Sequence, residues 1–110
     1  MNLQEWEQGG DFLEVDEGKL FYRVAGEGDP LLLLHGFPTS SWDFHAIWPT
    51  LAAQYRVITY DKLGFGFSDK PSVGDYTIDA HLRRTWALLT ALGITQVQLL
   101  AHDVGNTITQ

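Results

Sequence analysis

Residues 99–105, with the sequence LLAHDVG, join an apolar run to a turn in which Asp103 lies between the small residues Ala101 and Gly105. This pattern is typical of a sharp strand-to-helix turn, because small flanking residues let the strand and helix approach closely. The middle residue of such a turn has a strained backbone, which Asp tolerates better than most residues. A Ser there needs a base to remove its proton, whereas an Asp with a pKa of roughly 3.9 is already ionised. Asp103 could therefore attack carbon directly and form an ester, which a base-activated water would later hydrolyse.

A second segment, His35-Gly36-Phe37-Pro38, follows the apolar run 31–34. Turns of this kind use two backbone N–H donors as an oxyanion hole, one after the nucleophile and one from the loop after an early strand. Val104 and Phe37 fit these two positions. Gly36 would allow close approach of the backbone, and Pro38 would fix its course, through a cis bond if one forms there. Each segment also has a simpler interpretation, since Asp is a favoured helix N-cap and Gly-x-Pro is common in ordinary turns.

The elements that must position these residues alternate between strands and helices. Ser40 or Ser41 could cap a helix from residue 42, which Pro49 would break or restart, and Thr77 could cap a helix that ends at residue 92. In this last helix one apolar stripe comprises Ile78, Leu82, Trp86, Leu89 and Leu92. The predicted strands cover 12–16, 20–25, 31–34, 56–60 and 96–101. After an opening hairpin, this order predicts an α/β fold with a mostly parallel sheet flanked by helices.

Composition narrows the class of protein further. The 110 residues suffice for one domain, and 45% of them are hydrophobic. A formal charge of −7 argues against nucleic acid and anionic membrane surfaces as partners. The absence of Cys excludes disulfides, thiolate metal sites and a Cys nucleophile. Residues 1–7 do not resemble a signal peptide, and no apolar run is long enough to span a membrane, so we expect a soluble, cytoplasmic domain.

Three segments in this order, 35–41 (HGFPTSS), 63–71 (LGFGFSDKP) and 102–105 (HDVG), resemble the α/β-hydrolase superfamily. The similar branch contains epoxide hydrolases, haloalkane dehalogenases and the mesoderm-specific transcript protein, and the resemblance extends over residues 12–110. It implies the α/β-hydrolase fold, with no cofactor or metal. It also implies a catalytic Asp103, an oxyanion hole from the N–H groups of Phe37 and Val104, and a site shaped by His35, Gly36, Pro38, His102 and Gly105.

Departures from the branch narrow the expected reaction. Haloalkane dehalogenases usually have Asn at the position of Phe37 and Trp at that of Val104, where their side chains hold the departing halide. Neither Phe nor Val has a side-chain donor, so dehalogenation is disfavoured. The form His-Gly-Phe-Pro is common among epoxide hydrolases. The resemblance therefore favours opening of an epoxide on a small apolar organic substrate, through an alkyl-enzyme ester.

In this family the nucleophile turn is followed by further strands, a helical lid, the acidic catalytic residue and the His that acts as the base. We therefore interpret residues 1–110 as the N-terminal part of one α/β-hydrolase domain, truncated after that turn and unable to turn over alone. The strand 96–101 would then be an unpaired edge. Of the histidines, His35 and His102 are expected to shape the site, whereas His45 and His81 are expected at the surface. Their spacing does not suggest a metal site.

Two other classes of function remain open. Gly64-Phe65-Gly66 after a strand could indicate a dinucleotide-binding domain, but position 69 is Asp where a third Gly is required, and no helix opens directly at the glycines. The alternative for these glycines is close packing of the loop beside the nucleophile turn. A non-catalytic scaffold or interaction module of hydrolase descent is the other possibility, because the base and acid are missing.

Overall fold

A five-stranded mixed sheet forms the centre of the computed structural model, which describes residues 1–15, 17–36 and 39–101. Its strand order is β1-β2-β4-β3-β5. The strands β1 and β2 form an antiparallel hairpin, and β2 pairs antiparallel with β4. The strand β3 pairs in parallel with β4 and β5. The bounds are β1 Asp11–Val15, β2 Gly18–Ala25, β3 Pro30–Leu34, β4 Arg56–Tyr60 and β5 Gln98–Ala101. The predicted α/β class and N-terminal hairpin are confirmed.

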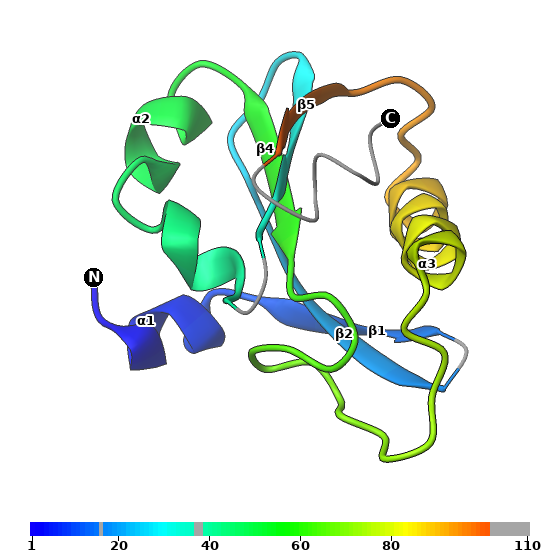
Figure 1. The fold of residues 1–110 in the computed structure, drawn as a ribbon. Helices are drawn as coiled ribbons and strands as arrows, with labels where there is room; N and C mark the ends of the chain where they lie inside the picture. Colours follow the sequence, from blue (N-terminus) through cyan, green and yellow to red (C-terminus); the bar gives the residue numbers. More distant parts are fainter. Residues whose placement is uncertain (16, 37–38, 102–110) are drawn as a thin grey trace.

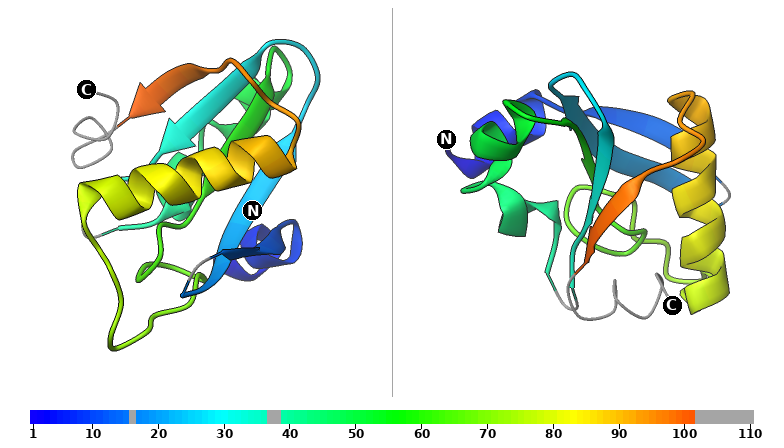
Figure 2. Two further views of the ribbon diagram at one scale, coloured as in Figure 1. Left: turned by 90° about the vertical axis from the view of Figure 1, so that its right-hand side faces the viewer. Right: turned by 90° about the horizontal axis from the view of Figure 1, so that it is seen from above.

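Helices cover both faces of this sheet (Figures 1 and 2). On one side lie α1 (Leu3–Gln8), the 3-10 helix η1 (Ser41–Phe44) and α2 (Trp48–Ala52), and on the other lies α3 (Ile78–Ala91). Alternation along β3 explains the two cores. Leu32 and Leu34 pack into the cluster that contains Leu88 and Leu89 of α3, whereas Leu31 and Leu33 join the opposite cluster. The unbroken apolar run thus belongs to a strand that is covered on both faces.

The helix α1 was not predicted. Its signal was the capping box, in which the side chain of Asn2 accepts the Glu5 N–H and the Glu5 carboxylate accepts the Asn2 N–H, each at 2.8 Å. The indole of Trp6 is fully buried in the cluster beneath α2. The guanidinium of Arg23 lies 4.4 Å from the Trp6 ring centroid and donates to the Trp6 carbonyl at 2.8 Å.

The orientation of α3 differs from the prediction. Of the predicted stripe, Leu89 is buried, but Ile78, Leu82 and Trp86 are 37–50% exposed, and His81, expected at the surface, is buried. The helix instead turns a partly polar face to the sheet, and that face can be buried because its polar groups have partners. Thr85 Oγ lies 2.5 Å from the Tyr60 hydroxyl, and Arg84 forms a 2.7 Å ion pair with Glu17.

Most predicted boundaries agree with the structure to within two residues. Ser40 caps η1, Pro49 lies in the first turn of the separate helix α2, and Thr77 caps α3. Among the described strands, β5 has β3 as its one neighbour, and Leu99 and Leu100 are 46% and 42% exposed. The predicted open edge is therefore present. No helix within the described ranges is long and apolar enough to cross a membrane.

Candidate active site

The candidate site lies where the three parallel strands end. Leu34 at the end of β3 pairs with Tyr60 of β4 and with Ala101 of β5, so the three strands finish in register. The segments that begin at His35, Asp61 and residue 102 therefore leave the same edge of the sheet. In α/β sheets this carboxyl edge is where ligands bind. The predicted site residues Phe37, Pro38, His102, Asp103, Val104 and Gly105 lie outside the described residues, whereas His35 and Gly36 are placed at this edge.

His35 is fully buried, and its hydrogen bonds define its tautomer. The backbone N–H of Lys62 donates to Nε2 at 2.9 Å, so Nε2 carries a lone pair. Nδ1 lies 2.8 Å from the Gly36 carbonyl oxygen, which can only accept, so Nδ1 carries the proton. His35 is thus the neutral Nδ1–H form with both ring nitrogens engaged. This geometry leaves no nitrogen free to act as a base.

Burial keeps this imidazole neutral. Loss of hydration is the largest cause that lowers the pKa of His35, to about 4, and the neighbouring charge of Lys62 lowers it further. A proton on Nε2 would also collide with the Lys62 N–H. His81, in the first turn of α3, has its pKa lowered to about 4 by burial and by the charges of Arg84 and Lys62.

The Gly36 carbonyl oxygen accepts two hydrogen bonds from described residues. One comes from Nδ1–H of His35 at 2.8 Å, and the other comes from the backbone N–H of Thr39 at 3.2 Å. The Thr39 hydroxyl lies 3.0 Å from the same oxygen, but its one proton is directed to the Asp43 carboxylate, whose oxygen is only 2.5 Å away. Gly36 itself is buried. The two donors on one oxygen restrict the orientation of this peptide group.

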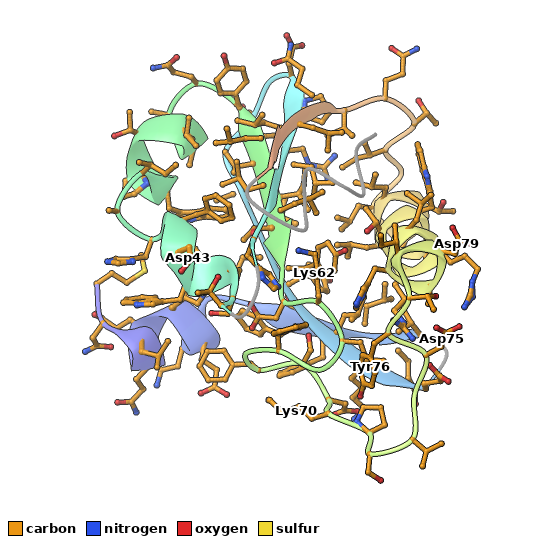
Figure 3. All side chains as sticks on the ribbon, in the orientation of Figure 1. Asp43, Lys62, Lys70, Asp75, Tyr76 and Asp79 are labelled. Atoms are coloured by element: carbon orange, nitrogen blue, oxygen red, sulfur yellow. The ribbon has the colours of Figure 1, made fainter. Side chains whose placement is uncertain are left out.

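Lys62, which sequence reasoning missed, is also fully buried at this edge. Its side chain lies inside the molecule at the end of β4, whereas Lys70 lies on the outer loop (Figure 3). The Lys62 Nζ donates to the carbonyl oxygen of His35. Loss of hydration lowers the pKa of Lys62 to about 8. A lysine directly after an apolar strand was the available signal, since that position lies at the carboxyl edge of the sheet.

Asp61, the neighbouring residue, is a second group that sequence reasoning missed. One carboxylate oxygen accepts the Ser41 N–H and the other accepts the Phe67 N–H, each at 2.7 Å. Burial raises the pKa of Asp61, and these hydrogen bonds oppose the shift. The indole N–H of Trp6 donates to Ser41 Oγ at 3.1 Å, so α1 is tied to the same network.

The glycines of the 61–75 loop serve its own packing. Gly66 has φ +53°, and a Cβ there would lie 2.1 Å from a carboxylate oxygen of Asp61. Gly64 has φ +93°, and a Cβ there would lie 2.8 Å from the Tyr76 ring. These constraints account for the Gly-x-Gly spacing without a dinucleotide. Among the described residues these glycines pack against Asp61 and Tyr76, and their expected packing beside the nucleophile turn stays a prediction, because that turn lies outside the described residues.

A mostly apolar cavity of about 430 Å³ adjoins this loop, with Phe65, Pro71, Tyr76, Ile78 and His81 in its wall. Phe65 connects the cavity to the candidate site, because its ring packs edge-on against the imidazole of His35 with centroids 5.5 Å apart. Within the described ranges, no group of three His, Asp or Glu side chains is arranged to hold a metal ion.

Comparison with known proteins agrees with this architecture. Residues 29–109 match the family model for the alpha/beta hydrolase fold. A mesoderm-specific transcript homolog protein of Bos taurus is 42% identical over 98% of this chain and 34% of its own length. Haloalkane dehalogenase 2 of Mycobacterium bovis is 34% identical over 88% of this chain and 34% of its own. The crystal structure of an epoxide hydrolase from Vigna radiata has a TM-score of 0.84 and 32% identity, covering 91% of this chain and 33% of that one.

The chain therefore belongs to the alpha/beta hydrolase fold family. It spans about a third of the length of these relatives. The expected resemblance and fold class are confirmed, and the matching region is the N-terminal portion.

Proposed function

We propose that this chain carries the nucleophile and both backbone donors of the oxyanion hole of an epoxide-hydrolase-like enzyme. The observation that carries the proposal is the common end of β3, β4 and β5, since β5 ends two residues before Asp103 in the sequence, at the edge that holds His35 and Gly36. The proposed nucleophile is Asp103, and the proposed oxyanion donors are the N–H groups of Phe37 and Val104. Membership of the hydrolase family supports these roles.

In the proposed reaction an oxygen of the Asp103 carboxylate attacks a carbon of the epoxide ring. A carbon–oxygen bond forms, the ring carbon–oxygen bond breaks, and the released alkoxide takes up a proton to become a hydroxyl group. No atom of the epoxide is lost, so the protein gains its whole mass. Water then attacks the ester carbonyl, whose oxygen becomes an oxyanion held by the two N–H donors, and the diol leaves.

Two side chains favour epoxides over alkyl halides as substrates. A departing halide needs N–H donors, and neither Phe37 nor Val104 offers one from its side chain. The ring oxygen of an epoxide stays attached to the product and requires a proton donor instead. The apolar wall of the cavity beside Phe65 is consistent with a small apolar organic substrate.

The test is intact-mass spectrometry of the chain after incubation with a panel of small epoxides and alkyl halides. We expect one adduct per chain with an epoxide, at its full mass, and a slower or absent reaction with halides. Asp103→Asn is the matched control, because it keeps the size of the side chain and removes the nucleophile. A folded wild-type chain without any adduct would contradict the proposal and favour a non-catalytic scaffold of hydrolase descent.

A further inference from the structure

Two adjacent residues after β4 hold the two ends of the segment 35–41. At one end, Lys62 donates its backbone N–H to His35 Nε2 at 2.9 Å and its Nζ to the His35 carbonyl oxygen. At the other end, Asp61 accepts the Ser41 N–H at 2.7 Å. Both residues are buried, so these contacts are shielded from water.

The buried ammonium group of Lys62 opposes folding, which argues against a purely structural role. Burial lowers the pKa of Lys62 to about 8, and this shift measures the loss of hydration that the charged form suffers in the folded chain. An apolar side chain of similar length could fill the same space without this loss. Residues that destabilise a fold are retained where they serve an active site.

We propose that Lys62 is a positioning residue of the hydrolase site described above, acting on the oxyanion loop through His35. The inference rests on the proposed function. The Nζ of Lys62 donates to the His35 carbonyl, whereas its backbone N–H holds the imidazole, whose Nδ1–H donates to Gly36 O at 2.8 Å. The His35 carbonyl belongs to the peptide group that joins His35 to Gly36, so loss of the Nζ contact alone frees that peptide group next to the oxyanion loop.

The effect on chemistry follows from the planarity of the peptide group. The Gly36 carbonyl shares its peptide group with the N–H of residue 37, the proposed oxyanion donor. In a planar trans peptide the two point in opposite directions, so donors that fix the carbonyl also fix the direction of that N–H. While Asp103 attacks, this donor would hold the carboxylate oxygen that does not react. Small errors in such positioning lower rates strongly.

The first test measures the rate at which an epoxide alkylates the chain, followed by intact mass. Lys62→Met removes the donor at nearly constant length, and Lys62→Arg restores a charged donor. Lys19→Met is the matched control, because Lys19 is an exposed lysine on β2 that does not line the cavity beside Phe65. We expect a roughly tenfold slower reaction in Lys62→Met, recovery to within about threefold in Lys62→Arg, and no change in Lys19→Met.

The second test observes the contact itself and does not depend on alkylation. The carbonyl 13C signal of His35 in wild-type protein should titrate with a midpoint near pH 8, because a neutral amine is a weaker donor than an ammonium group. The same titration should be absent in Lys62→Met. The other ionisable groups that interact electrostatically with Lys62 or His35, or adjoin them, are His81, Asp43 and Asp61.

These outcomes separate the two proposals. An epoxide adduct that forms equally fast in wild type and Lys62→Met, or a His35 carbonyl signal that does not titrate near pH 8, overturns the role of Lys62 alone. Absence of any adduct in the wild-type chain refutes the proposed function, and the positioning role with it.

Discussion

Acidification should destabilise this fold through its two buried histidines, His35 and His81. Both are at most 5% exposed, and both have a pKa lowered to about 4 from 6.5. In the unfolded chain each imidazole takes up a proton near pH 6.5. Between pH 6.5 and 4 the unfolded state therefore binds more protons than the folded state, and the free energy of unfolding falls as the pH falls.

The magnitude follows from the size of the two shifts. Each histidine has a pKa of 6.5 in the unfolded chain and about 4 in the folded chain. This difference lowers the free energy of unfolding by about 3 kcal/mol for each histidine between pH 6.5 and pH 4. The two together approach the whole stability of a small domain, which is on the order of 5–15 kcal/mol. We therefore expect the chain to unfold, or to be close to unfolding, near pH 4.

The assay is urea unfolding at several pH values from 7 to 4.5, followed by the fluorescence of the buried Trp6 and Trp48. His35→Gln should lower stability at pH 7, because an amide cannot reproduce both ring hydrogen bonds, but should remove about half of the pH dependence. His45→Gln, the same substitution at a half-buried histidine, is the control and should keep the wild-type slope. A wild-type stability that stays constant from pH 6.5 to 4.5, or a full slope in His35→Gln, would refute the reasoning.

Two further predictions concern single substitutions read out as urea midpoints. Asp61→Asn should lower the free energy of unfolding by about 3 kcal/mol. Both carboxylate oxygens accept backbone N–H groups at 2.7 Å, and the amide NH₂ of Asn would face one of these donors. An unchanged urea midpoint would contradict this prediction. Gly26→Ala should cost at least about 3 kcal/mol, since φ is +83° and the Cβ would lie 2.2 Å from the Tyr55 carbonyl. Gly93 has φ +73° and no atom within 4 Å of a Cβ placed there, so Gly93→Ala should lower the free energy of unfolding by only about 1 kcal/mol. Equal losses of stability at Gly26 and Gly93 would show that the steric contact at Gly26 has no effect.

The strands and their succession along the chain could be predicted because each strand carries a local signal. The apolar run of β3 reflects burial on both faces, and the N-terminal hairpin follows its own alternation. The face that α3 packs against the sheet could not be predicted in this way. Apolar periodicity shows which apolar side chains a helix could bury, and it does not show which polar side chains find partners in the folded chain. Arg84 and Thr85 are buried because Glu17 and Tyr60, distant in sequence, supply partners.

Residue type and spacing singled out His35 and Gly36, which lie at the carboxyl edge of the sheet, and their roles in shaping a site stay predictions. Asp61 and Lys62 were missed because their roles depend on contacts across 20 or more residues, to Ser41 and to His35. The positions of the remaining predicted site residues and the cytoplasmic location stay predictions.

Tandem mass spectrometry of the digested chain can locate the residue that an epoxide modifies. We expect the added mass on Asp103, its release by hydroxylamine as expected for an ester, and no such adduct in Asp103→Asn. A modified histidine or lysine, stable to hydroxylamine and still present in Asp103→Asn, would show that Asp103 is not the nucleophile.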